Sequence, residues 1–436
     1  MPFSTDTRTL QPGDTFVAIR GETYDGHDFV TQAVAKGAAR VVVERVVEVP
    51  ERIAVTVVED SVAYLVAQAR AKMAQLQPTV VAITGSIGKT TTRAAIAAAL
   101  AEAFPVVASE GNKNTPLGLA LLLLNRTITP DTKLVLEMGA RLPGDLRDLC
   151  TYFPPTISVV TNVRGVHVET LGSIEGVQRE KSELVRALDA SGTAILNGDD
   201  PRVRAMADVN AGRTVLYGRG DVNDLRPDRI TEPLPMLGEH AILVALAAYG
   251  VGHTLGMTPG QILAGLGRTT LEKGRLNRLR GRGGSVLIDD TYNASPDPVR
   301  VALRVLRDLD VEGAGRRIAF LGDMLELGTD EIAQHAEVLT YAVELADAVH
   351  TVGPRMTEAG ALLPDELRGR VVSWPSSQAV ADEIRASRIA IEPGDVALVK
   401  GSQGMRMERV SEALLHPDLD PADHLPRQST SWKQIA

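Results

Sequence analysis

The sequence predicts a three-domain α/β protein, and three observations carry that prediction. A chain of 436 residues is too long for one compact domain. Apolar runs typical of strands alternate with amphipathic runs typical of helices over most of its length. The alternation starts afresh after residue 270, where a helical run follows each strand-like run. We therefore expect domains at 1–77, 78–270 and 271–415, followed by a flexible tail at 416–436.

The first domain is predicted to be a small α/β unit, joined to the next at "QLQPTV", where Pro78 precedes a new strand. Apolar, β-branched runs mark its strands, and longer runs with apolar residues at helical spacing mark its helices. The strands are expected at 14–19, 40–45 and 53–60, and the helices at 28–38 and 62–76.

The central domain is predicted to contain a mostly parallel sheet, because parallel neighbours need crossover connections that are usually helical. Its strands are expected at 79–85, 133–139, 156–163, 193–199 and 214–218, with helices including 91–104 and 174–190.

The third domain shows the same alternation and is predicted to be Rossmann-like. Its strands are expected at 284–290, 316–323, 347–353, 369–374 and 395–402. The last residues carry three prolines and no periodicity, which predicts a mobile tail.

Composition narrows the class of protein. A net charge of −9 argues against nucleic acid or an anionic membrane as the main partner. The sequence shows neither a run long enough for a membrane helix nor a secretory signal, so a cytoplasmic protein without membrane insertion is expected, with a monomer as the simplest state. The single cysteine, Cys150, excludes an intrachain disulfide and fits a reducing compartment; inert packing is a better interpretation of it than catalysis.

The stretch "VVAITGSIGKTTT" carries the strongest chemical signal. A strand turns through Gly85 and Gly88 into a helix, so backbone N–H groups and the positive helix end can face an oxyanion. Lys89 can reach outer phosphates and the Thr90 hydroxyl can bind Mg²⁺. Only two residues separate the glycines, where the common loop has four. We predict a P-loop central domain that binds nucleotide through Gly85, Ser86, Ile87, Gly88, Lys89, Thr90 and Thr91.

Three more residues are candidates for a metal site near this loop. Glu137 ends a predicted strand, where carboxylates of parallel sheets lie near ligands, although a surface role is equally compatible with its position. His167 lies on the loop after the next strand; polar surface is its simpler interpretation. Lys181 lies on an amphipathic helix between two glutamates, which fits a solvated lysine in helical ion pairs. The chain has 9 lysines against 37 arginines, and only a primary amine can capture CO₂ as a carbamate that ligates metal.

In chain order, these motifs make the sequence similar to the Mur ligase family. The central domain carries "TGSIGKTTT", "EGNKNTPLG", "VLEMGA", "TNVRGVHVETLGS", "REKSEL" and "AILNGDDP". The opening "DTRTLQPGDTFVAIRGETYDGHDF" resembles the family's uridine-nucleotide-binding domain. The third domain's "EKGRL", "LIDDTYNASPDPVRVAL", "FLGDMLELG" and "LVKGS" look most like the member that adds D-alanyl-D-alanine.

The resemblance implies an ATP-dependent ligase of peptidoglycan precursor synthesis. Its substrates would be UDP-N-acetylmuramoyl-tripeptide and D-alanyl-D-alanine, joined through an acyl phosphate. It also implies two Mg²⁺ ions and a carbamate on Lys181.

Site residues follow from the same resemblance, motif by motif. Catalytic roles are implied for Lys89, Lys181, His167 and Asn112. Metal binding is implied for Thr90, Glu137, His167 and Lys181. The third domain would complete the ATP site with Arg275, Asp290 and Asn293. In the first domain, Thr7, Arg8, Asp25 and His27 would meet the uridine diphosphate.

Two other functions remain open at this stage. One is a sister Mur or folylpolyglutamate-type ligase that adds another amino acid, against which "DDTYNASP" and "GDMLELG" speak. The other is a catalytically degenerate homologue that only binds nucleotide sugar. It is motivated by a short link at 218–238 and by Ala241 and Val244, which stand where the family carries two asparagines; "GNKNT" likewise has Thr115 in place of an asparagine.

Overall fold

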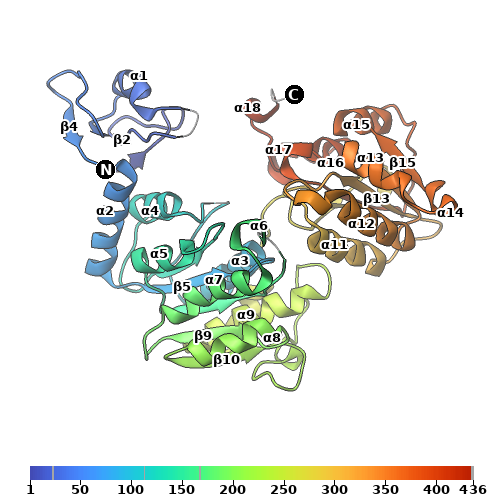
Figure 1. The fold of residues 1–436 in the computed structure, drawn as a ribbon, viewed down its shortest axis with the longest axis horizontal. Coiled ribbons are helices and arrows are strands. Elements are labelled where there is room, and N and C mark those ends of the chain that lie inside the picture. The colour runs from blue at the N-terminus through green and yellow to red at the C-terminus, as the bar shows by residue number, and fades with distance from the viewer. Residues whose placement is uncertain (22–23, 112, 166–167, 434–436) are drawn as a thin grey trace. The chain divides into compact units, whose positions relative to one another are not determined.

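The computed structural model describes residues 1–21, 24–111, 113–165 and 168–433. By its internal contacts the chain divides into two compact units, which are described separately. The first comprises residues 1–231 and 244–268, and the second comprises 232–243 and 269–436. Two sheets belong to the first unit and a third sheet to the second, so the chain contains the three α/β sheets that the predicted three-domain fold requires (Figure 1).

The first sheet has four parallel strands in the order β1-β2-β3-β4. A cluster including Phe16, Val30, Ala33 and Val41 fills the space between the strands and the first helix. The next helix starts where the Asp60 side chain accepts a hydrogen bond from the Ala63 amide at 2.8 Å. The elements are β1 (Phe3–Ser4), β2 (Thr15–Val17), α1 (Val30–Ala35), β3 (Arg40–Val43), β4 (Ala54–Val57) and α2 (Ser61–Leu76).

The second sheet has six parallel strands in the order β10-β9-β8-β5-β7-β6. Since β5 lies between β8 and β7, its carboxyl end is at the point where the strand order reverses, the usual ligand position in such sheets. The strands are β5 (Thr79–Thr84), β6 (Val106–Ala108), β7 (Lys133–Glu137), β8 (Ile157–Val160), β9 (Thr193–Asn197) and β10 (Arg213–Tyr217).

Helices cover both faces of this second sheet. Apolar residues of alternating strand positions pack against α2, α4, α5 and α7 on one side, and α3 lies on the other side with α10 against it. Thr115, which replaces the expected asparagine, caps α4 by accepting from the Gly118 amide at 3.3 Å. The helices are α3 (Lys89–Leu100), α4 (Pro116–Asn125), α5 (Asp145–Tyr152), α6 (Val168–Leu171), α7 (Ile174–Arg186), α8 (Pro201–Arg204), α9 (His240–Thr254) and α10 (Pro259–Leu266).

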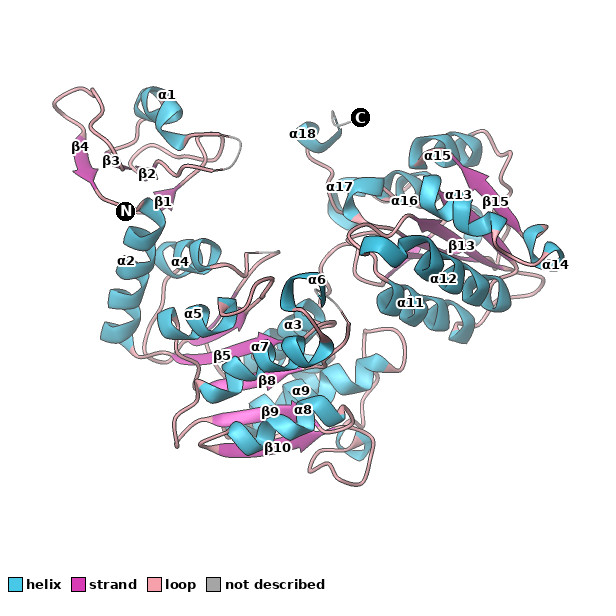
Figure 2. Ribbon diagram, viewed as in Figure 1, coloured by secondary structure: helices cyan, strands magenta, loops and turns pink. Residues whose placement is uncertain are grey.

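The third sheet has the order β11-β12-β16-β13-β14-β15, with only β11 antiparallel among the described strands. One face packs against α11, α12 and α13, and the other against α15 and α16 (Figure 2). This two-sided cover agrees with the Rossmann-like prediction. The elements are β11 (Asn277–Arg280), β12 (Val286–Asp290), α11 (Pro296–Asp308), β13 (Arg317–Gly322), α12 (Glu331–Leu345), β14 (Ala348–Val352), α13 (Pro354–Ala361), α14 (Asp365–Arg368), β15 (Val371–Trp374), α15 (Ser377–Arg385), β16 (Val396–Lys400), α16 (Glu408–Leu414), α17 (Pro421–His424) and α18 (Thr430–Lys433).

The prediction of a flexible tail is wrong for residues 416–433. This segment forms α17 and α18, and Leu425 lies at 1% exposure in the core beneath α16. The prolines stand at helix starts and in bends, where they need no backbone donor, so their presence did not mean disorder.

Three further findings bear on the sequence-based expectations. Cys150 lies in the core, where burial raises the pKa of its thiol to about 12, which supports packing over catalysis. Ala241 and Val244 are also buried, so the apolar residues occupy packed positions. Among the described residues, no helix has both the length and the apolar character that crossing a bilayer requires.

Candidate active site

The predicted phosphate loop connects the carboxyl end of β5 to the start of α3. Gly85 has φ of +150°, and a Cβ there would lie 1.9 Å from Thr161 Oγ1, so only glycine fits. Gly88 has φ of +83° and occupies the N-cap position of α3, with no atom near its missing Cβ. The two glycines are therefore required for different reasons, one steric and one conformational.

The loop after β8 supports the phosphate loop from behind. Thr161 Oγ1 and Asn162 Nδ2 both donate to the carbonyl of Ile87, at 2.7 and 2.9 Å. Asn162 Oδ1 accepts from the Ile87 amide at 3.0 Å. The Ser86 hydroxyl accepts from the Arg164 amide at 2.9 Å. Because these bonds fix the loop's own backbone, its conformation is set before any ligand arrives.

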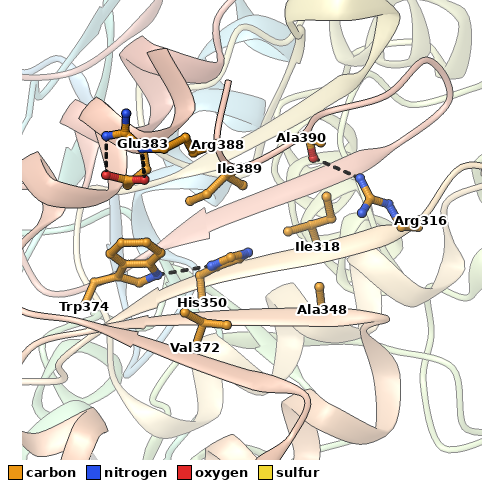
Figure 3. Close-up of a pocket in the computed structure, with 10 residues that line it drawn as sticks. All are labelled: Arg316, Ile318, Ala348, His350, Val372, Trp374, Glu383, Arg388, Ile389 and Ala390. Atoms are coloured by element: carbon orange, nitrogen blue, oxygen red, sulfur yellow. Dashed lines mark hydrogen bonds and ion pairs between the residues drawn. The ribbon is translucent and has the colours of Figure 1, made fainter. Parts of the chain in front are cut away.

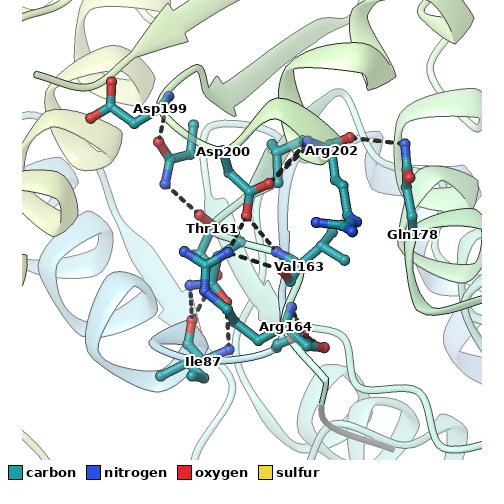
Figure 4. A network of polar contacts seen from close by, with 12 residues as sticks. Ile87, Thr161, Val163, Arg164, Gln178, Asp199, Asp200 and Arg202 are labelled. Carbon is teal, nitrogen blue, oxygen red and sulfur yellow. Dashed lines mark hydrogen bonds and ion pairs between the residues drawn. The ribbon is translucent and has the colours of Figure 1, made fainter. Parts of the chain in front are cut away.

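The "NGDDP" motif supports that loop in turn (Figure 4). Asp200 Oδ2 accepts from the Val163 amide at 2.9 Å and from Arg164 Nη1 at 2.8 Å. The same carboxylate caps α8 by accepting from the Arg202 amide at 3.0 Å. Asn197 Nδ2 donates to the Thr161 carbonyl at 2.8 Å. The motif at the end of β9 thus supports the phosphate loop indirectly, by holding the loop that follows β8.

Lys89, Thr90 and Glu137 are brought together at the start of α3. Lys89 Nζ donates to the carbonyls of Gly85 at 2.8 Å and Ser86 at 3.3 Å, so its ammonium lies over the loop. Thr90 Oγ1 donates to Glu137 Oε2 at 3.0 Å, and both side chains are buried. Both residues were predicted to bind one Mg²⁺; the structure places them in direct contact, and their metal role stays a prediction. Thr91 lies half-buried one residue further along the helix.

Two polar residues beside Glu137 were not predicted. Arg93 is 4% exposed, and its Nη1 lies 3.8 Å from Glu137 Oε2. Asn114 Nδ2 donates to Glu137 Oε1 at 3.3 Å. A signal for Arg93 was present, because it follows Thr90 by three residues and so shares its helix face. Asn114 had none beyond its place in "GNKN".

The hydroxyl and carboxylate of Thr90 and Glu137 suit Mg²⁺, which keeps several waters and takes only one or two protein oxygens beside substrate phosphates. Among the described residues, no group of three or more His, Cys, Asp or Glu side chains is arranged so that it could hold a metal ion. The described side chains therefore do not form a complete set of protein ligands for a metal ion.

Lys181 is 4% exposed on α7. Burial, followed by the positive charge of Lys89, lowers the pKa of its ammonium to about 7. The neighbouring Glu180 is also buried and is engaged by backbone amides. Its Oε2 accepts from the Gly144 amide at 2.7 Å and its Oε1 from the Leu146 amide at 2.8 Å, at the start of α5. The interpretation of Lys181 as a solvated lysine is therefore wrong.

Two predicted residues, Asn112 and His167, lie outside the described part of the chain. Their catalytic and metal-binding roles stay predictions.

The three residues predicted in the second unit lie around one turn after β12. Asp290 Oδ2 pairs with Lys400 Nζ at 2.6 Å, and Lys400 Nζ also donates to the Asn293 carbonyl at 2.8 Å. The Arg275 guanidinium lies 3.8 Å from the centre of the Tyr292 ring. Arg275 Nε is a buried donor without a hydrogen-bond acceptor among the described residues.

The four residues predicted to bind uridine diphosphate form local contacts in the first sheet's unit. Thr7 Oγ1 donates to Gln32 Oε1 at 2.8 Å, and Arg8 pairs with Asp6 at 2.7 Å. His27 is buried, with Nδ1 bonded to Asp25 Oδ1 at 2.6 Å and Nε2 accepting from the Glu44 amide at 2.8 Å.

Both ring nitrogens of His27 are thus occupied by the protein. Asp25 also caps the 3₁₀ turn at Gly26–Phe29 and pairs with Arg45 at 2.8 Å. The hydrogen bond from the His27 amide, followed by those from the His27 ring and the Arg45 side chain, lowers the pKa of the Asp25 carboxyl. These two residues therefore shape their loop.

A pocket of about 310 Å³ lies elsewhere in the second unit (Figure 3). Trp374 Nε1 donates to His350 Nδ1 at 3.1 Å, and His350 stacks on Phe320 with ring centroids 4.8 Å apart. None of the lining residues is one that the sequence predicted as functional.

Comparisons with known proteins agree with the motifs. Family profiles match three stretches: "Mur ligase family, catalytic domain" at 3–104, "Mur ligase middle domain" at 83–251 and "Mur ligase, glutamate ligase domain" at 274–403. The UDP-N-acetylmuramoyl-tripeptide--D-alanyl-D-alanine ligase of Bacillus subtilis is 32% identical over 95% of this chain and 93% of its own length.

Solved structures match as well. MurF from Acinetobacter baumannii superposes with a TM-score of 0.82 at 28% identity, over 94% of this chain and 93% of that one. MurF ligase from Thermotoga maritima in complex with ADP gives 0.80 at 28% identity, over 94% and 96%.

Proposed function

The chain belongs to the Mur ligase family, and from that premise we propose that it joins D-alanyl-D-alanine to UDP-N-acetylmuramoyl-tripeptide at the expense of ATP. The observation that carries this proposal is the preformed phosphate loop, with Lys89 over it and the Thr90–Glu137 pair beside it. The UDP-N-acetylmuramoyl-tripeptide--D-alanyl-D-alanine ligase of Bacillus subtilis matches nearly the whole chain, which supports this choice of substrates.

The reaction that this site would serve has two steps. A carboxylate oxygen of the tripeptide attacks the γ-phosphorus of ATP, the bond to the ADP oxygen breaks, and an acyl phosphate forms. The amine of the dipeptide then attacks the acyl carbon and loses a proton, and inorganic phosphate leaves with that carboxylate oxygen. Activation is needed because a carboxylate is a poor electrophile until its oxygen belongs to a good leaving group. Positioning and charge neutralisation supply most of the catalysis in such reactions.

The proposal assigns the following roles to the described site residues. The loop amides and Lys89 hold the phosphates, and Lys89 neutralises charge that develops on the transferred group. Thr90 and Glu137 hold Mg²⁺, which when bound neutralises phosphate charge and orients the leaving oxygens. In the second unit, Arg275, Asp290 and Asn293 bind the nucleotide. Thr7, Arg8 and the backbone around Asp25–His27 contact the uridine diphosphate. Since the reaction consumes ATP, the cytoplasm is the proposed compartment.

Lys181 is proposed to carry the carbamate. The lowered pKa leaves a large fraction of its amine neutral near pH 7, and CO₂ reacts only with the neutral amine. An N–C bond forms, one proton leaves, and the product is an anionic oxygen ligand for a second metal ion. With ¹³C-labelled bicarbonate, NMR should show a carbamate carbon that Lys181→Ala removes. A spectrum without that carbon would contradict the assignment.

The substrate assignment is tested by mass spectrometry of the product. The enzyme is incubated with ATP, Mg²⁺ and UDP-N-acetylmuramoyl-tripeptide, and D-alanyl-D-alanine, single amino acids or glutamate are added in turn. The pentapeptide product should form only with the dipeptide. The rate of product formation should fall at least about a hundredfold in Lys89→Ala. It should not fall in Lys133→Ala, because Lys133 lies at the end of β7 away from Glu137.

The other outcomes identify the alternatives. Product from a single amino acid would make the chain a sister ligase. Nucleotide binding without any product would make it a degenerate homologue.

A further inference from the structure

The C-terminal segment, residues 416–433, packs against the turn at residues 290–293, which carries Asp290 and Asn293 of the proposed nucleotide site. Lys273 Nζ donates to the Ala422 carbonyl at 2.5 Å. A Cβ on Gly274 would lie 3.1 Å from Pro426 Cγ and 2.9 Å from the Tyr292 amide nitrogen. The segment therefore packs against both chain stretches, 273–275 and 290–293, that hold those residues.

Arg427 makes the most specific of these contacts. Its Nη1 donates to the Tyr292 carbonyl at 3.3 Å, and its Nη2 donates to the Thr291 carbonyl. Nη2 also lies 2.9 Å from Glu408 Oε2, and the side chains of Arg427 and Glu408 are 6% and 2% exposed. One buried guanidinium thus holds two consecutive carbonyls of the turn.

Glu408 fixes the direction of this guanidinium. Its second oxygen, Oε1, accepts from Arg406 Nε at 2.6 Å, and the Arg406 side chain is 7% exposed. The carboxylate is therefore anchored between two arginines, in a place where it can move little. A planar fork held in this way has a fixed aim, which a lysine ammonium cannot reproduce.

The turn between these anchors carries the proposed nucleotide contacts. Lys400 holds Asp290 and the Asn293 carbonyl from one side, and Arg427 holds the two carbonyls between them from the other. The Tyr292 ring packs against Arg275. With its backbone fixed at both places, the turn can present the Tyr292 ring and the Asn293 side chain in one arrangement before the nucleotide binds, which lowers the ordering cost of binding.

We propose that Arg427, oriented by Glu408, is a positioning residue for adenine nucleotide in the second unit, so that the C-terminal segment is part of the nucleotide site. This inference rests on the proposed function for the roles of Arg275, Asp290 and Asn293. It adds a residue to the site that touches the turn and not the reacting atoms.

The test is nucleotide affinity measured directly, by calorimetric titration of the full chain with ADP and Mg²⁺. Arg427→Ala should raise the Kd for ADP about tenfold, because the two carbonyls lose their donors. Arg427→Lys keeps the charge but not the fork and should give an intermediate Kd. In steady-state assays the KM for ATP should rise while the KM for the dipeptide stays unchanged.

Arg316→Ala is the matched control. Arg316 also bridges a carboxylate and a backbone carbonyl in this unit, at 2.7 Å to Asp395 Oδ2 and 2.9 Å to the Ala390 carbonyl. Both alanine variants should lower the melting temperature, but only Arg427→Ala should weaken ADP binding. Should Arg427→Ala not fold, the Arg427→Lys titration decides the matter.

A wild-type Kd in the folded Arg427 variant, or an equal rise in Arg316→Ala, would overturn the proposal and leave the proposed function standing. Failure of the wild type itself to bind ADP would overturn the proposed function and this inference with it.

Discussion

Gly85→Ala and Gly88→Ala should have unequal effects, because the structure makes the two glycines necessary for different reasons. At Gly88 the added Cβ meets no atom within 4 Å, so the cost is that of a positive φ, about 1–2 kcal/mol. At Gly85 the φ is also positive, and the Cβ would lie 1.9 Å from Thr161 Oγ1. The hydroxyl must move and give up its bond to the Ile87 carbonyl, which adds about 1 kcal/mol, and the loop must shift as well.

The assay is calorimetric titration with ADP and Mg²⁺, with urea unfolding of each variant to confirm the folded fraction. Gly88→Ala should weaken binding about five- to thirtyfold. Gly85→Ala should weaken it about a hundredfold or more, since a loop displaced by about 1 Å no longer places its amides on the phosphates.

A double variant tests the steric argument itself. Thr161→Ala removes the hydroxyl, the nearest of the Thr161 atoms that the new Cβ would meet, so adding it to Gly85→Ala should restore part of the affinity. Strictly additive losses, or a larger effect at Gly88 than at Gly85, would refute this account of the loop.

Three further variants or treatments test other parts of the structure. Asp289 is fully buried, and burial raises the pKa of its carboxyl to about 6, so the stability it contributes is present below its unfolded pKa of about 4 and is lost as pH rises through 6. The free energy of unfolding of Asp289→Asn, measured with urea, should therefore exceed that of wild type by about 3 kcal/mol at pH 8, and this gain should vanish near pH 4. A difference that does not change with pH would count against this account. Glu180→Gln keeps one of two amide bonds and loses the charge at the start of α5, so urea unfolding should show a loss of about 1–2 kcal/mol, against no change for Glu183→Gln. Cys150 should react with iodoacetamide only in denaturant, and rapid labelling of the native chain would disprove its burial.

The strands were predictable because their signals are local. Runs such as "VVAITG" and "IAFLG" are apolar, and all the strands expected from such runs are present. The strands that sequence reasoning missed are the short β1 and β6 and the antiparallel β11 at a sheet edge, whose "NRLR" has three polar residues out of four. Pairing with β12 across a glycine turn, and not local pattern, makes β11 a strand.

The site was predictable to the same extent and for the same reason. A contiguous motif predicted the loop and helix start at Gly85–Thr91, and a strand end predicted Glu137, which the structure places in contact with Thr90. Arg427 could not be found in this way, because its partners, Glu408 and the turn after β12, are brought to it only by the folded chain. His27 shows what a motif cannot reveal: both its ring nitrogens are bonded within the protein. Its predicted contact with a ligand stays a prediction.

The most direct test of the central claim is the fate of a carboxylate oxygen. UDP-N-acetylmuramoyl-tripeptide labelled with ¹⁸O in the terminal carboxyl group is converted with ATP and D-alanyl-D-alanine, and the released phosphate is analysed by mass spectrometry. An acyl phosphate predicts one ¹⁸O atom in each phosphate. Phosphate without ¹⁸O, from a reaction that still yields the peptide bond, would contradict the proposed transfer to the substrate carboxylate.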